Sequence, residues 1–296
     1  MLSDEVRALP LWRGPFVGGT QRPSLPEVRT ADEIGRHRAT SVSHMSIDPG
    51  VPVALACVLL LAVTVTAYVV GGLPGPHTPV VAMLRAVGQL GVAALVITVV
   101  VRSLALSVLL LCAMFAVAVL TTTGRIGARG AWPWATVAML SGLLPVVVVV
   151  LATGTVPPTG IALIPVVGII AGNTMNGHSL VCRRAFAALR EETGQYEAAL
   201  SLGLDRSDAV AEVIHRRVPE ALVPGLDQVR TAGVVTLPGA FIGVLLGGGT
   251  PAQAASAQVL VLVGIMAAQT VTAVVAERLV GRALLLPDDL RPVIRP

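Results

Sequence analysis

A group of polar side chains follows a strongly apolar stretch in IPVVGIIAGNTMNGHSLVCRRAF, residues 164–186. Asn173, Asn176 and His178 can donate and accept hydrogen bonds, and Met175 carries a soft thioether sulfur. These side chains could line a path that coordinates a metal ion weakly. They could instead join neighbouring helices through hydrogen bonds worth about 0.6 kcal/mol each in a membrane. A tight iron site would need carboxylates, thiolates or several imidazoles. A transport path needs only weak ligands, so both interpretations stay open.

A second polar pair, Arg85 and Gln89, lies four residues apart in RAVGQL and therefore on one face of a helix. An arginine inside an apolar span costs about 2.5–3.5 kcal/mol on insertion scales, so it is expected to face protein, water or headgroups. The pair either lines a substrate path or reaches toward the interface. The cysteines Cys57, Cys112 and Cys182 form no C-x-x-C pair, and we expect them to pack in the membrane core. We assign no metal site firmly.

The elements that must position these residues are transmembrane helices. The chain has 296 residues, of which 54% are hydrophobic and 13% are charged, and its mean hydropathy is +0.80. Soluble domains have about 25% charged residues. Because lipid offers no hydrogen bonds, valine-rich runs are expected to form helices here. We predict an all-α, polytopic membrane protein with about seven spans. The expected spans are Val51–Val70, Val80–Val101, Leu104–Thr121, Trp134–Leu151, Ile161–Cys182, Val229–Leu246 and Ala252–Ala276.

Two sets of small residues recur every four positions in the expected spans. This spacing lets another backbone approach closely, and a proline beside it allows a kink. The pattern predicts close helix packing or a hinge for gating. The residues are Gly168 and Gly172 in the fifth span, and Pro238, Gly239, Gly243 and Gly247 in the sixth.

Charged residues gather in one long polar loop, residues 183–228. The positive-inside rule places this loop and the C-terminal tail, residues 283–296, in the cytoplasm, and seven spans then place the N-terminus outside. The permease domain is expected to cover residues 49–282. The Pro- and Arg-rich segment 1–48 has arginines on the wrong side in this topology. A translation start at Met45, or a disordered tail, would remove the conflict.

The polar loop contains QYEAALSLGLDRSDAVAEVIHRRVPE, which predicts two short amphipathic helices. The first, Glu191–Leu202, should end at Gly203 in a left-handed conformation. The second should begin with Asp205 or Ser207 as its cap and end at Pro219. Such helices either dock into a groove of a partner protein or lie at the lipid interface.

The amino-acid sequence of the loop resembles that of a known family. Glu197, Ala198, Ala199 and Gly203 form EAA-x-x-x-G, which resembles the coupling loop of ABC-transporter membrane subunits. Together with IPVVGIIAGNTMN, ALVPGLDQVRTAGVVTLPGAFIGVLLGG, TPAQAASAQVLV and RAVGQL, it resembles the UPF0014 permeases, FetB-type subunits linked to iron export and related to plant aluminium-sensitivity permeases. The resemblance covers roughly residues 51–282.

What the resemblance implies is a permease subunit in the plasma membrane that exports iron or another metal. The implied partners are an ABC ATPase that docks at Glu197, a second copy of the permease in a homodimer, and membrane lipid. ATP and Mg would be bound by the ATPase, and this chain would need no cofactor of its own.

The composition also excludes several functions. All 21 basic residues are arginine, so the chain contains no P-loop lysine and no Schiff-base lysine. H-E-x-x-H and G-x-S-x-G are absent as well, and we therefore expect a transport subunit and not an enzyme. The net charge of +4 suits loop arginines that face anionic lipid, and does not suggest nucleic acid. The alternative is a secondary transporter of a small solute or ion.

Overall fold

The computed structural model describes residues 50–294, and within that range the chain forms helices and turns without a strand. The predicted all-α fold is confirmed. The expectations for segment 1–48 and Met45 lie outside the described residues. The elements are α2 (Val51–Val70), α3 (Thr78–Val100), α4 (Leu104–Arg125), η1 (Arg129–Ala131), α5 (Trp132–Ala152), α6 (Gly160–Glu191), α7 (Thr193–Ser201), α8 (Arg206–Ile214), α9 (Val218–Thr231), α10 (Gly239–Leu246), α11 (Pro251–Gly281) and α12 (Arg291–Ile294).

Six helical segments in the described range are long and apolar enough to cross a membrane: α2, α3, α4, η1 with α5, α6 and α11. They coincide with six of the expected spans. The expected span Val229–Leu246 has a different structure, because α9 ends at Thr231 and α10 begins only at Gly239. Gly233 has φ +84°, a left-handed value that favours glycine, and Pro238 is extended at the start of α10. The expected sixth span is therefore not a continuous helix, and it is not among the six segments that are long and apolar enough to cross a membrane.

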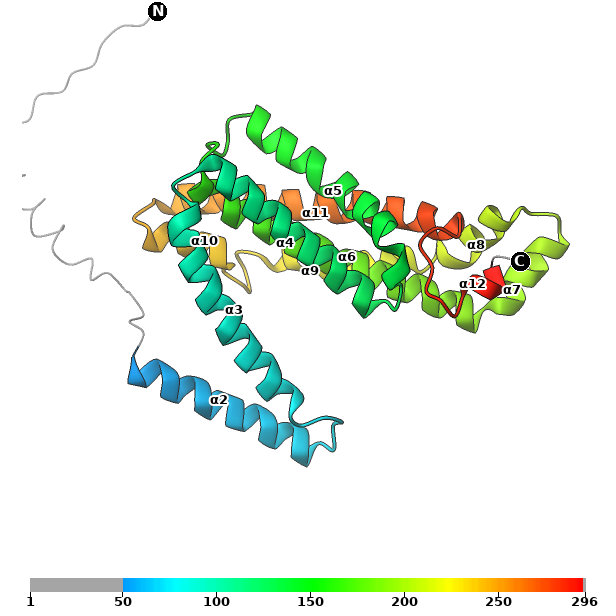
Figure 1. The fold of residues 1–296 in the computed structure, drawn as a ribbon, viewed down its shortest axis with the longest axis horizontal. Coiled ribbons are helices and arrows are strands. Elements are labelled where there is room, and N and C mark those ends of the chain that lie inside the picture. The colour runs from blue at the N-terminus through cyan, green and yellow to red at the C-terminus, as the bar shows by residue number, and fades with distance from the viewer. Residues whose placement is uncertain (1–49, 295–296) are drawn as a thin grey trace, which may run out of the picture. The chain divides into compact units, whose positions relative to one another are not determined.

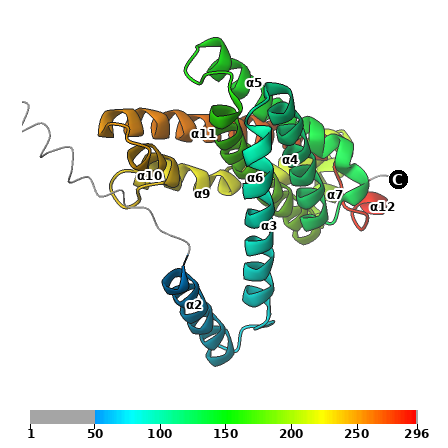
Figure 2. The same cartoon turned by 60° about the vertical axis from the view of Figure 1, so that its left-hand side comes forward.

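The core lies among α4, α5, α6 and α11 (Figure 1). Helix α11 contacts α5, α6, α8, α9 and α10, and α6 contacts α4, α5, α7, α8, α9 and α11, so these two long helices form the centre of the bundle. Helices α7, α8 and α12 gather at one end of this bundle, and α10 lies at the opposite end. Figure 2 shows α9 and α10 following one another beside α11.

The two ends of the described chain differ in burial. Helices α2 and α3 contain no buried residue, and their apolar side chains suit contact with lipid. The segment that follows α11 was expected to be a cytoplasmic tail. Its side chains Leu285, Leu286, Leu290 and Ile294 are buried in the same hydrophobic cluster as Phe186 of α6. This segment is thus part of the core at the end of the bundle that carries α7 and α8.

Gly142 lies at a close contact between α5 and α11. A Cβ atom at this position would collide with the carbonyl oxygen of Ala268 and with Oγ1 of Thr272. That Thr272 hydroxyl is buried and has no hydrogen-bond partner among the described residues. Only glycine lets the two helices meet here.

The glycines singled out by their spacing lie in more open surroundings. Within the described chain, no atom is within 4 Å of a Cβ placed on Gly172, Gly239 or Gly243. Gly168 would meet only the methyl group of Met114, at 3.2 Å, and Gly247 only carbonyl oxygens of its own helix. Close packing at Gly239 and Gly243 therefore stays a prediction, and it would require a neighbour outside this part of the chain.

We expect Gly142→Ala to lower the thermal stability of the detergent-solubilised protein, because overpacking costs about 1–3 kcal/mol. Gly172→Ala is the matched control within a span. It adds the same methyl group into open space, and alanine favours a helix by about 1 kcal/mol over glycine. Equal melting temperatures for the two variants would contradict the close approach of α5 to α11.

Candidate functional site

Helix α6 carries the polar cluster and extends beyond the membrane. Its 32 residues are about 48 Å long, whereas the hydrocarbon core is about 30 Å thick. Arg183, Arg184 and Arg190 lie in its last turns and are exposed. The residues from Asn173 to His178 therefore lie inside the membrane, near the level at which α6 leaves it.

Asn173 lies where α6 meets α11. Its side-chain Nδ2 donates to the carbonyl of Ile169 in its own helix, at 2.9 Å. Its backbone carbonyl accepts a hydrogen bond from Nε2 of Gln269 of α11, also at 2.9 Å. Gln269 was not predicted as a site residue, although a lone glutamine in an apolar span is the sequence signal that could have found it. Glycines on two sides, Gly177 and Gly225, leave room for its side chain.

Asn176 and Met175 have different neighbours from Asn173. Oδ1 of Asn176 accepts a hydrogen bond from Nη1 of Arg125 at 3.0 Å, which joins α6 to the end of α4. Met175 is partly buried and packs against the hydrophobic cluster that contains Phe186. Because Met175 is two residues from Asn173, their side chains point about 160° apart on the helix. The structure does not bring the thioether and the Asn173 amide to one face.

His178 belongs to a buried polar cluster between α4 and α6. Its Nδ1 lies 2.9 Å from Oγ1 of Thr122, and that hydroxyl lies 2.7 Å from Oγ of Ser179. The His178 Nε2 faces Sγ of Cys182 at 3.7 Å. All four side chains are buried. The cluster pairs polar groups across two helices, which fits the packing interpretation for His178.

Arg85 and Gln89 lie apart from these groups. Both are exposed on α3, and neither forms a hydrogen bond with a polar side chain of α6 in the described structure. Across residues 50–294, no group of three or more His, Cys, Asp or Glu side chains is arranged to hold a metal ion. Any metal that passes would have to use amide, hydroxyl and backbone oxygens, or single sulfur and imidazole groups.

The segment between α9 and α10, residues 232–238, has irregular backbone. The carbonyl of Thr231 accepts from the N–H groups of Val235, at 2.9 Å, and Thr236, at 3.3 Å. Val234 and Val235 are 87% and 75% exposed. Irregular backbone at membrane depth is stable only where protein buries it or where it lines a water-filled cavity. This segment is one candidate for such a lining, beside the residues singled out from sequence.

A glutamine fixes the start of α10 after this break. The N–H of Phe241, in the first turn of α10, donates to Oε1 of Gln258 on α11 at 3.3 Å. Gln258 is buried. It supplies one acceptor for the free N–H groups of a helix that starts inside the membrane.

The corner between α7 and α8 presents a compact exposed surface. Gly203 has φ +89°, as its predicted left-handed role requires. Glu197 and Ala198 are exposed, whereas Ala199 is buried against the body of the protein. Leu202 at the corner is 82% exposed. The outward face of this corner is therefore formed by Glu197, Ala198 and Leu202.

The second helix of the loop confirms one boundary and corrects another. Asp205 caps α8 as predicted, since its Oδ1 accepts from the N–H of Asp208 at 2.8 Å. The expectation that Pro219 ends this helix is wrong. Helix α8 already ends at Ile214, and Pro219 lies in the first turn of α9, where its missing N–H costs no hydrogen bond.

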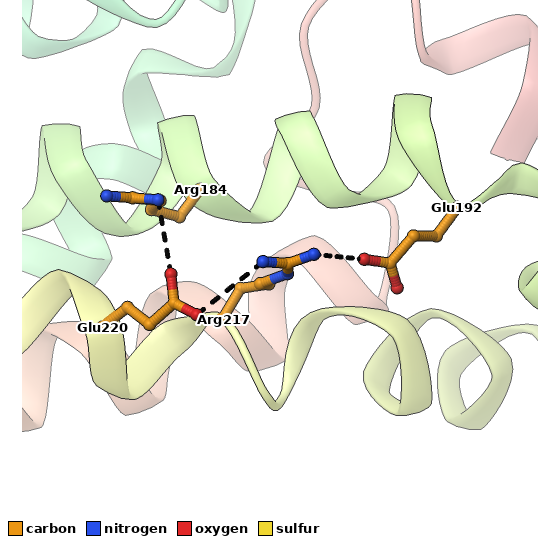
Figure 3. A network of polar contacts seen from close by, with 4 residues as sticks. All are labelled: Arg184, Glu192, Arg217 and Glu220. Atoms are coloured by element: carbon orange, nitrogen blue, oxygen red, sulfur yellow. Dashed lines mark hydrogen bonds and ion pairs between the residues drawn. The ribbon is translucent and has the colours of Figure 1, made fainter.

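A network of ion pairs holds this corner to α6 (Figure 3). Arg217 contacts Glu192 at 2.7 Å and Glu220 at 3.7 Å, and Arg184 of α6 contacts Glu220 at 3.3 Å. The hydrogen bond to Glu192 and the negative charges of Glu192 and Glu220 raise the pKa of Arg217. Each exposed pair contributes at most about 1 kcal/mol, so the network orients the chain more than it stabilises it.

Two further pairs join the same end of the molecule to other elements. Nδ1 of His215, just after α8, lies 2.7 Å from Oε1 of Glu277 on α11. Arg190 of α6 contacts Asp289, in the segment after α11, at 2.8 Å. The corner between α7 and α8 is thus connected to both long helices of the bundle.

The sequence is similar to a family of membrane proteins. Residues 51–285 match the family described as Uncharacterised protein family (UPF0014). The chain is 30% identical over 228 residues to the UPF0014 membrane protein STAR2 of Oryza sativa subsp. japonica, which covers 76% of this chain and 79% of that protein. No solved structure matches significantly.

Two other relatives match over shorter segments. The chain is 30% identical to Protein ALUMINUM SENSITIVE 3 of Arabidopsis thaliana, over 38% of this chain and 41% of that protein. It is 29% identical to the Escherichia coli protein named "Probable iron export permease protein FetB", over 43% of this chain and 49% of that protein. The match thus spans less than half the length of either relative.

The buried cluster around His178 gives a prediction for stability. Thr122→Val keeps the shape of the side chain but removes the hydroxyl that both His178 and Ser179 contact, so we expect a loss of about 1–3 kcal/mol. The control is Thr98→Val, because the exposed Thr98 hydroxyl donates only to the carbonyl of Leu95 in its own helix. Thermal unfolding in detergent measures both. If Thr122→Val is as stable as Thr98→Val, the cluster does not join α4 to α6.

Proposed function

Because the chain belongs to the UPF0014 family, we propose that it is the membrane-spanning permease subunit of an ABC transporter. In this proposal it exports iron or another metal from the cell and uses ATP that a separate subunit hydrolyses. The observation that carries it is the exposed corner of α7 and α8, which displays Glu197, Ala198 and Leu202 while Ala199 is buried. The proposed metal substrate is supported by the similarity to the E. coli protein named "Probable iron export permease protein FetB".

The corner has the properties that a docking element needs. It is short, helical and exposed, and it offers an apolar side chain beside a carboxylate. The contacts of Arg217 with Glu192 and of His215 with Glu277 link this end of the chain to α6 and α11. A movement of the corner caused by the ATPase would therefore move these membrane helices. A helix that merely lay on lipid would not need this attachment to the long helices.

The proposed orientation places this end in the cytoplasm of a cell whose plasma membrane contains the protein. The loop and the ends of α6 and α11 contain most of the arginines in the described range, as the positive-inside rule expects for a cytoplasmic face. The broken segment α9–α10 counts as one crossing together with the six continuous spans.

The proposed substrate path runs along the junction of α6, α9 and α11. Asn173 and Gln269 would provide weak oxygen ligands there, beside Gly225 of α9. Weak ligands suit a path, because a transported ion must bind and leave. The open faces at Gly239 and Gly243 suit a second copy of the chain, so we propose a homodimer that pairs with two ATPases.

A secondary transporter of a small solute or ion is the second candidate. The observation that favours it is the broken helix α9–α10, because discontinuous helices form the binding sites of many secondary transporters. The two proposals differ in their energy source. Proteoliposomes that contain only this chain and move substrate in response to an ion gradient would support the secondary transporter and contradict the ABC proposal.

Substitutions at the corner test the coupling. We expect Glu197→Arg and Leu202→Asp to leave the protein folded but to abolish co-purification of its ATPase, and to reduce iron efflux from preloaded cells to the level of cells that lack the transporter. Both changes disrupt only outward-facing contacts. Glu212→Arg is the control, because Glu212 is also exposed but lies on α8, where its carboxylate contacts Arg216 at 3.5 Å. Normal recovery of the complex with both corner variants would refute the docking surface.

A substitution at Asn173 tests the path. Because its side chain donates only to its own helix, Asn173→Ala should leave the melting temperature nearly unchanged. We expect it to remove the stimulation of ATP hydrolysis by added Fe²⁺ in the reconstituted complex while basal hydrolysis persists. Asn176→Ala should instead lower stability, because it removes the contact with Arg125. Undiminished stimulation in the Asn173 variant would exclude Asn173 from the path.

A further inference from the structure

An apolar groove lies between α4 and the first turns of α5. It has a volume of about 400 Å³. Its lining residues are Phe115, Ala116, Val119 and Leu120 of α4, and Trp132 and Thr136 of α5. The one hydroxyl in this lining, that of Thr136, already donates to the carbonyl of Trp132 at 2.9 Å. The groove therefore offers mainly hydrocarbon contacts, and the indole N–H of Trp132 is its other polar group.

One end of the groove is cationic. Gly124 lies one helical turn after Leu120 and thus continues the α4 face that lines the groove. A Cβ placed on Gly124 would lie 4.0 Å from Nε of Arg129, so the guanidinium group lies over this bare glycine. Arg129 is exposed. A positive charge is therefore held directly beyond the apolar lining.

No carboxylate of the described chain neutralises that charge. Arg129 is within salt-bridge distance of none of the acidic side chains in residues 50–294. The sequence contains no Asp or Glu at all from Val51 to Arg190, a stretch that includes α4, η1 and α5. Arg291, whose guanidinium lies against Gly130, is paired with Asp288. Arg129 therefore has its positive charge available for an external anion.

The tryptophans place this end of the groove at the membrane surface. Trp132 is 54% exposed and Trp134 is 38% exposed, and exposed tryptophans gather at the level of the lipid headgroups. From Gly124 to Phe115, α4 rises by about 13 Å, close to half of the hydrocarbon thickness of about 30 Å. The groove thus runs from the headgroup level through about one leaflet.

We propose that this groove binds an anionic phospholipid, with its phosphate on Arg129 and an acyl chain along α4 and Trp132. The lipid supplies the negative charge that the chain lacks, at a depth where the phosphate stays hydrated. A helix of a second copy would cover Arg129 with apolar protein and leave its charge unpaired, which is costly. The proposal needs only insertion into a membrane and does not depend on the transport function.

Native mass spectrometry of the full chain, purified from vesicles with equal amounts of phosphatidylglycerol and phosphatidylcholine, tests the site. We expect wild type to retain phosphatidylglycerol selectively. Arg129→Gln should weaken that retention by about fivefold, the effect of one basic side chain at an anionic surface. Ala116→Trp, which fills the groove, should reduce retention of both lipids.

Matched controls separate the groove from general lipid contact. Arg102→Gln removes an exposed arginine at the other end of α4, and Val117→Trp introduces the same side chain at an exposed position next to Ala116. Both should retain lipid like wild type. Unchanged phosphatidylglycerol retention in Arg129→Gln would overturn the proposal. So would a change from dimer to monomer in Ala116→Trp without loss of lipid, because the groove would then hold a second copy.

Discussion

The hydrogen bond from Gln269 to the carbonyl of Asn173 fixes the place where α6 and α11 cross, and most of the fold depends on that crossing. An amide buried at this depth needs a partner, since lipid provides none. Gly177 and Gly225 leave the space that its side chain occupies between α6 and α9. Because α11 also contacts α5, α8 and α10, the register set at Gln269 positions both the broken segment and the helices at the charged end.

The parts of the structure that follow from local chemistry could be predicted from sequence. Hydropathy located the six continuous spans, and α2 has the predicted bounds. This was possible because each spanning helix forms its backbone hydrogen bonds within itself, so its position does not depend on its neighbours. Gly203 and Asp205 were identified because a left-handed turn and a helix cap each demand a particular residue type at one position. None of these features requires knowledge of which helix lies beside which.

The features that were missed depend on tertiary neighbours. Hydropathy treats Val229–Leu246 as uniform, although Gly233 and Pro238 break it into two helices. Gly142 follows the small residue Ala138 by four positions, but its close contact depends on the path of α11 past it, which the sequence does not show. Gln269 could have been noticed as a polar residue in an apolar span, but its partner, a backbone carbonyl, has no sequence signature. The sequence placed the candidate substrate path at a polar cluster on α6, whereas the structure favours the junction of α6, α9 and α11.

The length of α6 has a mechanical consequence. Between Pro165 and Glu191 the helix has no internal proline, so it can turn as a stiff rod about its contact with Gln269 at Asn173. The segment of α6 from Asn173 to Glu191 is about 27 Å long and the segment back to Gly160 is about 20 Å long, so the contact with Gln269 lies nearer the Gly160 end of the helix. A push of about 3 Å at the Glu192–Arg217 contact would swing the opposite end of α6 by about 2 Å the other way. Such a tilt of α6 would widen the path through the protein on one side of the membrane and narrow it on the other.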